Sequence, residues 1–96
     1  MNVGIRNVSY FNGLYDNKSE EIILPTNLST KLDLSAVKII RMMGCVYMIP
    51  TKEGYSVRNH KISMPRQIFK LYFGTTKKTK LKLIFKKNKI QITCQN

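Results

Sequence analysis

The chain has 96 residues, of which 43% are hydrophobic, and a formal net charge of +12. A chain of this length is expected to form one small domain, residues 1–96. It shows neither the continuous apolar stretch of a secretory signal nor a run long enough to span a membrane, so we expect a cytoplasmic protein. So high a positive charge implies a polyanionic partner.

Turn formers, prolines and apolar spacing predict the elements of the first half. Residues 9–19 are expected to form a loop, because Asn12-Gly13 and Asp16-Asn17 are turn formers. The apolar side chains of this loop are expected to pack against the body or against a partner. Around it we expect strands at residues 3–8 and 20–24, a short helix after Pro25, and a hairpin of residues 37–41 and 45–49 around a turn at residues 42–44.

The second half is expected to repeat this order. Strands are predicted at residues 55–58 and 61–64, a helix after Pro65 that ends at Gly74, and a hairpin of residues 80–85 and 90–94. In that hairpin apolar residues alternate with lysines, which is typical of a strand with one buried face. The predicted fold class is therefore mainly β with two short helices (α+β).

Two segments of the chain follow the same plan. Residues 22–32 read IILPTNLSTKL and residues 62–72 read ISMPRQIFKLY. A unit of this size cannot bury its own apolar face, so we expect two repeats, about 3–50 and 55–95, to form one body with pseudo-two-fold symmetry. The charge is not repeated: residues 1–50 carry five basic and four acidic side chains, and residues 51–96 carry twelve and one.

The second half holds the candidate nucleic-acid-binding residues. Residues 77–89 contain seven lysines with no acidic residue among them: Lys77, Lys78, Lys80, Lys82, Lys86, Lys87 and Lys89. Such lysines either contact phosphates or form a solvated strand face that protects a sheet edge. Readout of base edges is expected from Arg58, Arg66 and Gln67, whose side chains make paired hydrogen bonds.

The repeated pattern resembles the AbrB/SpoVT/MazE family of swapped-hairpin DNA-binding domains. The family unit runs strand, turn, strand, proline, short helix, Leu-Gly and β-hairpin. VGIRNV, EEIILPTNLSTKLDL and VKIIRMMGCVYMI follow that order in the first copy, and YSVRNHKISMPRQIFKLYFG and KLKLIFKKNKIQI follow it in the second. The first copy departs from the pattern in having Asp33 where glycine is usual, and in a loop at 9–19 longer than the family's hairpin.

The resemblance implies a pseudo-two-fold, swapped-hairpin β-barrel of the AbrB type, as a monomeric pseudo-dimer or a homodimer. It also implies that DNA is contacted by basic residues at strand ends and around the short helix. Arg58, Lys61, Arg66 and Lys70 match these positions in the second copy, and only Arg6 and Lys31 lie near matching positions in the first. The predicted nucleic-acid-binding residues are Arg6, Arg58, Lys61, Arg66, Gln67, Lys70, Lys77, Lys78, Lys80 and Lys82.

The leading hypothesis is a small basic DNA-binding protein, a transcriptional regulator that docks on duplex DNA through its second repeat. One alternative is a phage or mobile-element protein, or an antitoxin-like module, that inhibits an acidic host protein and contacts it through residues 9–19. Another is an RNA-binding protein. Aromatic residues such as Tyr55, Phe69 and Phe85 either stack on single-stranded bases or pack in the core.

Catalysis has little support in the sequence. The acidic residues are scattered, and no motif for a phosphate loop, a nucleophile elbow or a zinc protease is present. One histidine and two cysteines outside a CxxC pair do not form a common zinc pattern. We therefore expect no enzyme activity, no cofactor and no metal.

Overall fold

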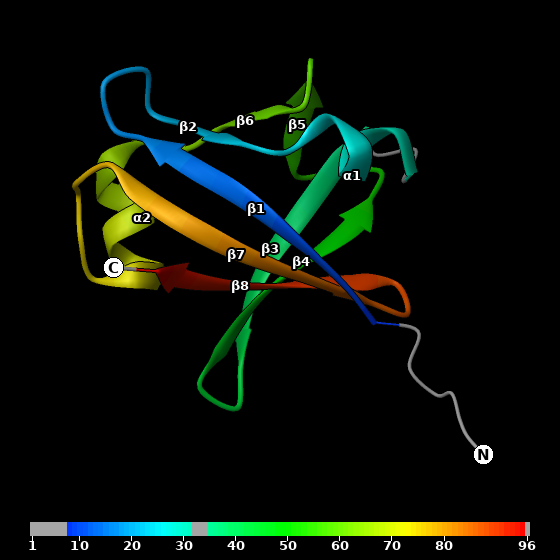
Figure 1. Ribbon diagram of the computed structural model, residues 1–96. Coiled ribbons are helices and arrows are strands. Elements are labelled where there is room, and N and C mark those ends of the chain that lie inside the picture. Colours follow the sequence, from blue (N-terminus) through cyan, green and yellow to red (C-terminus); the bar gives the residue numbers. More distant parts are fainter. Residues whose placement is uncertain (1–7, 32–34, 96) are drawn as a thin grey trace.

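The computed structural model describes residues 8–31 and 35–95, which form a closed antiparallel barrel with two short helices (Figure 1). The elements in chain order are β1 (Val8–Asp16), β2 (Glu21–Ile23), α1 (Thr26–Lys31), β3 (Ala36–Met42), β4 (Cys45–Thr51), β5 (Tyr55–Arg58), β6 (Lys61–Ser63), α2 (Arg66–Phe73), β7 (Thr79–Lys86) and β8 (Lys89–Gln95). The predicted class, mainly β with two short helices, is confirmed.

Strands from the two halves of the chain alternate in pairs around the barrel. The order is β1-β2-β6-β5-β3-β4-β8-β7, and β7 closes the ring on β1. β1 thus pairs with a strand of the second half, and β3 pairs with β5. Exchanging β1–β4 with β5–β8 leaves this cyclic order unchanged. Neither half closes a barrel by itself.

The registers of the two halves also correspond. Tyr15 pairs with Ile22 in the first half as Val57 pairs with Ile62 in the second. Between the halves, Leu14 pairs with Lys80 as Ser56 pairs with Ala36. Val46 likewise pairs with Ile92 as Ile90 pairs with Met48. Two backbone bonds outside the ladders follow the same rule, because the Leu24 amide donates to the His60 carbonyl and the Met64 amide to the Glu20 carbonyl, each at 2.8 Å. Ile22 faces Ile62 between β2 and β6, at the centre of this relation.

The loop predicted at residues 9–19 is wrong, because residues 8–16 form β1 and only a short turn follows. β1 is held by β2 on one side and by β7 on the other. Gly13 lies inside this strand rather than in a turn, and a Cβ there would stand 3.0 Å from Leu83 Cδ1 and 3.1 Å from the Ile23 carbonyl oxygen. Glycine therefore allows the neighbouring strands to approach closely. Residues 3–7 of the predicted first strand lie outside the described residues.

Both strand–proline–helix junctions form as predicted. Pro25 follows β2 and precedes α1, and Pro65 follows β6 and precedes α2. Pro65 is extended, with φ −56° and ψ 146°, and its carbonyl accepts the amide of Phe69 at 3.0 Å. α2 ends where Gly74, at φ 75°, donates its amide to the Lys70 carbonyl at 2.8 Å, so the predicted helix C-cap is confirmed.

Both predicted hairpins form, with strands slightly longer than expected. β3 and β4 meet at a turn of Met43 and Gly44, and β7 and β8 meet at Lys87 and Asn88. The inward-facing side chains of the barrel and one face of α2 make a single core, with Tyr15, Ile62, Phe69, Leu83 and Ile90 fully buried. Phe73 and Phe85 pack against this core. The opposite faces of the strands form the outer surface of the barrel.

Candidate nucleic-acid interface

The β5–β6 hairpin carries the first two predicted contact residues. Arg58 ends β5, Lys61 begins β6, and the two face each other directly in the antiparallel register. The turn between them, Asn59 and His60, has φ values of 49° and 53°, the left-handed geometry of a two-residue hairpin turn. Directly opposite side chains project from the same face of a hairpin, so both cations lie on the outer face of the barrel.

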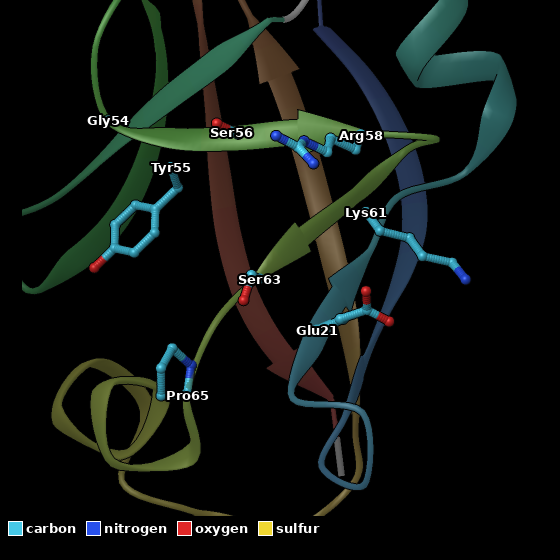
Figure 2. A pocket seen from close by; sticks show the side chains of 8 residues that line it. All are labelled: Glu21, Gly54, Tyr55, Ser56, Arg58, Lys61, Ser63 and Pro65. Carbon is cyan, nitrogen blue, oxygen red and sulfur yellow. The ribbon is translucent and has the colours of Figure 1, made fainter.

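An open pocket of about 470 Å³ lies beside this hairpin. Its lining is Glu21, Gly54, Tyr55, Ser56, Arg58, Lys61, Ser63 and Pro65. Figure 2 shows Arg58 and Lys61 on the hairpin, with Glu21 on the neighbouring β2 close to Lys61. The two cations and two serine hydroxyls of this lining can donate hydrogen bonds to phosphate oxygens, whereas the Glu21 carboxylate would repel a phosphate.

Arg66 is bound within the protein rather than free. Its guanidinium donates to the Asn17 carbonyl at 2.7 Å, and its Nε lies 3.9 Å from a Glu20 carboxylate oxygen. The same carboxylate oxygen accepts the Arg66 backbone amide at 2.9 Å, at the first turn of α2. The β1–β2 turn of the first half is thereby fastened to the helix of the second half. The Arg66 side chain remains 49% exposed.

The other predicted residues fall in three places. Gln67 and Lys70 are exposed on α2, next to the β5–β6 hairpin in the chain, and Lys77 and Lys78 are exposed in the connection to β7. Lys80 and Lys82 lie on β7, whose partners are β1 and β8 rather than β5 or β6. The structure therefore divides the predicted set between two faces of the barrel. Arg6 lies outside the described residues.

Equivalent register positions of the β1–β2 and β5–β6 hairpins carry opposite charges. Asp16 occupies in β1 the place that Arg58 occupies in β5, and Glu21 occupies in β2 the place of Lys61 in β6. Hydrogen bonds from the Lys18 and Ser19 backbone amides lower the pKa of Asp16, with the nearby Lys78 acting in the same direction. Asp16 is therefore ionised at neutral pH. Only the second half presents cations at these positions.

Two tyrosines with solvent-accessible rings were not identified as candidates from the sequence. Tyr10 on β1 is 65% exposed, and the Lys82 Nζ lies 5.3 Å from its ring centroid. Tyr47 on β4 is half-buried, and the Lys89 Nζ lies 5.1 Å from its ring. Tyr10 and Phe11 are neighbours in β1 and therefore point to opposite faces of the strand. This alternation could have identified Tyr10 as an outward residue, but the prediction of a loop at residues 9–19 left it unused. Phe69, in contrast, is buried in the core.

Metal and membrane features are absent from the described part of the chain. Within residues 8–31 and 35–95 no three His, Cys, Asp or Glu side chains come close enough to hold a metal ion. Both cysteines, Cys45 and Cys94, are free and half-buried. Neither described helix is long and apolar enough to cross a membrane.

Comparison with known proteins gave no relative. No family model, no curated protein and no solved structure matches this chain. The geometry of the barrel and its charges must therefore carry the functional interpretation.

Proposed function

We propose that this protein is a small, non-enzymatic DNA-binding protein, a transcriptional regulator that docks on duplex DNA through its second half. The contact surface would be the outer face of the β5–β6 hairpin and the exposed side of α2. Arg58 and Lys61 would contact phosphates, and Gln67 and Lys70 would lie closest to the groove. Residues such as these fix a protein on the duplex mainly by charge.

One observation carries the proposal: cations occupy one half at positions where the other half has carboxylates. Arg58 and Lys61 face each other across a rigid two-residue turn, beside an open pocket with two serine hydroxyls. A merely solvated surface mixes charges of both signs on the same element, whereas the β5–β6 hairpin carries only cations, with Glu21 of the neighbouring β2 as the one carboxylate of the pocket. A hairpin that carries only cations on its outer face is suited to a polyanion.

The arrangement of strands supports an AbrB-type body made of two repeats in one chain. Members of the AbrB-type family interleave the hairpins of two copies. In this chain β1 pairs with β7 and β5 pairs with β3, and the two pairings have equivalent registers. The strand–proline–helix junctions fall at equivalent places. The proposed pseudo-dimer needs no second chain to close the barrel.

Titration of a duplex with salt tests the proposal. Binding of a labelled random duplex of about 20 base pairs is measured by fluorescence anisotropy over a salt series for the native protein and for Arg58→Ala and Lys61→Ala. We expect each variant to bind more weakly and the slope of log K against log salt to fall by about 1. Lys52→Ala is the matched control, because Lys52 is exposed in the connection between β4 and β5. Equal slopes for all four proteins would overturn the proposal.

The alternative hypothesis, inhibition of an acidic host protein, depended on a free loop at residues 9–19, and most of this segment is a strand. Residues 9–16 are a central part of β1, so they are not a free loop that a partner binds. Deleting residues 9–19 would remove the strand between β2 and β7 and open the barrel. The deletion therefore does not separate protein binding from DNA binding.

A further inference from the structure

A second surface lies on the outer face of β1, β7, β8 and β4, away from the β5–β6 hairpin. Register pairs align four residues across these strands: Tyr10 faces Ile84, Ile84 faces Gln91, and Gln91 faces Tyr47. We call this set the tyrosine row. Figure 1 shows β1, β7 and β8 running side by side across the barrel.

The tyrosine row faces solvent. In β7, β8 and β4 the row lies next to Leu83, Ile90 and Met48, which are fully buried, and successive side chains of a strand point to opposite faces. Tyr10, at one end of the row, is 65% exposed. Because three strand spacings separate Tyr10 from Tyr47, their α-carbons lie about 14 Å apart along the row.

Lysines flank both ends of the row. Lys82 approaches the Tyr10 ring and Lys89 approaches the Tyr47 ring, each within cation–π distance. Lys86 faces Lys89 directly in the ladder, and like charges in that position repel unless an anion lies between them. On β1, β7 and β8, the row and the two residue rows beside it contain no carboxylate.

We propose that the tyrosine row is a binding site for unpaired nucleic acid. Bases would stack on Tyr10 and Tyr47, and the phosphates between them would contact Lys82, Lys86 and Lys89. Aromatic faces combined with a charged track are the features by which proteins hold single strands without sequence preference. A duplex does not offer its base faces, so this site is distinct from duplex docking and does not depend on it.

Two alternative occupants make different predictions. An acidic protein would also contact the lysines and could use the aromatic ring, but a site for such a partner would not make the affinity for an isolated single-stranded oligonucleotide depend on that ring. A duplex would contact Lys82 and Lys86 through phosphates alone. If the affinity for an oligonucleotide is kept in Tyr10→Phe, which retains an aromatic ring, and lost in Tyr10→Ala, which has only a methyl group, the ligand contacts the ring through unpaired bases.

The experiment uses the full chain and two labelled ten-nucleotide probes, oligo(dT) and oligo(rU), beside a blunt-ended duplex without unpaired bases. Affinities are measured by fluorescence anisotropy at about 50 mM salt, where phosphate contacts are strong. The proteins are the native chain, Tyr10→Ala, Tyr10→Phe and Lys82→Ala. Leu71→Ala is the control for trimming an exposed apolar side chain, since Leu71 on α2 is 70% exposed and outside the row. Circular dichroism verifies that each variant is folded.

We expect Tyr10→Ala to weaken binding of the single-stranded probe about tenfold, and Tyr10→Phe and Leu71→Ala to change it less than about twofold. The tighter of the two probes shows whether DNA or RNA is preferred. Duplex affinity should be unchanged in Tyr10→Ala. No binding of either single strand, or equal binding by native protein and Tyr10→Ala, overturns the proposal. Since duplex docking is tested with Arg58 and Lys61, the two proposals fail separately.

Discussion

Tyr15 of β1 stacks face to face on Phe69 of α2, with ring centroids 3.7 Å apart and ring planes 4° from parallel. Both side chains are fully buried, and the Tyr15 hydroxyl donates to the Met64 carbonyl at 2.7 Å. The pair joins a strand of the first half to the helix of the second. It is one of the contacts that fix the helix against the barrel.

Removing the Tyr15 hydroxyl tests this attachment. Tyr15→Phe keeps the stacked ring but leaves the Met64 carbonyl without its donor, so we expect the free energy of unfolding to fall by about 1 to 2 kcal/mol. Urea denaturation followed by circular dichroism measures the change. Tyr10→Phe is the matched control, and because Tyr10 is exposed we expect a change within about 0.5 kcal/mol. Equal stabilities of the two variants would show that the hydroxyl contributes nothing.

Alkaline pH should destabilise the protein through the same hydroxyl. Burial raises the pKa of Tyr15, and the Glu20 carboxylate acts in the same direction. Between the unfolded value, about 10, and the raised folded value, the unfolded chain loses this proton and the folded chain keeps it. The free energy of unfolding therefore falls as pH rises through that range.

Stability measured in urea from about pH 8 to about pH 11.5 detects this titration. Tyr15→Phe should show a shallower decline than the native protein above about pH 10. The remaining slope in the variant includes Cys94, whose pKa is also raised by burial and which therefore acts with the same sign. Parallel pH profiles for native protein and variant would refute the assignment to Tyr15.

Gly54 lies in the connection between β4 and β5, with its backbone close to Val37 of β3. At φ 137°, a Cβ on Gly54 would stand 2.4 Å from the Val37 carbonyl oxygen, a backbone atom that cannot rotate away. A Cβ on Gly44, at φ 78° in the β3–β4 turn, would meet no atom within 4 Å. We therefore expect the free energy of unfolding of Gly54→Ala to be more than about 2 kcal/mol lower than that of Gly44→Ala, as measured by thermal denaturation. Gly44→Ala has only the strain of a left-handed backbone, about 1 kcal/mol. Similar melting of both variants would contradict the close approach.

Glu20 holds the first turn of α2 by a charged contact. Its carboxylate accepts the Arg66 amide and lies near the Arg66 guanidinium. Glu20→Gln should lower the free energy of unfolding by about 0.3 to 1 kcal/mol in low salt, and by less at high salt, where the charge is screened. Urea denaturation at two salt concentrations measures the difference. Glu53→Gln, an exposed charge in the β4–β5 connection, should not show that salt dependence.

Local signals in the sequence predicted the parts of the fold that depend on neighbouring residues. The prolines marked both helix starts, Gly74 marked a helix end, and alternation marked the β7–β8 hairpin. β1 was mistaken for a loop because Asn12-Gly13 favours a turn locally, whereas its pairing with β7 depends on residues about seventy positions away. Distant pairing outweighed local preference there.

The candidate site divides in the same way. The turn that brings Arg58 opposite Lys61 is short enough to be predicted from the chain order alone. The contact that occupies Arg66 comes from Glu20, 46 residues earlier, and no local pattern announces it. The tyrosine row requires the registers of three strand pairs at once, so only the folded barrel reveals it.

The equivalence of Asp16 with Arg58 has a consequence for the symmetry of the protein's surface. Two identical subunits related by a two-fold axis must present the same residue at both positions, and such a surface reads the same in either direction. A chain that carries both halves is free of that constraint. With Asp16 at one position and Arg58 at the other, its surface has a polarity, so the proposed docking would favour one orientation on a track that has no symmetry of its own.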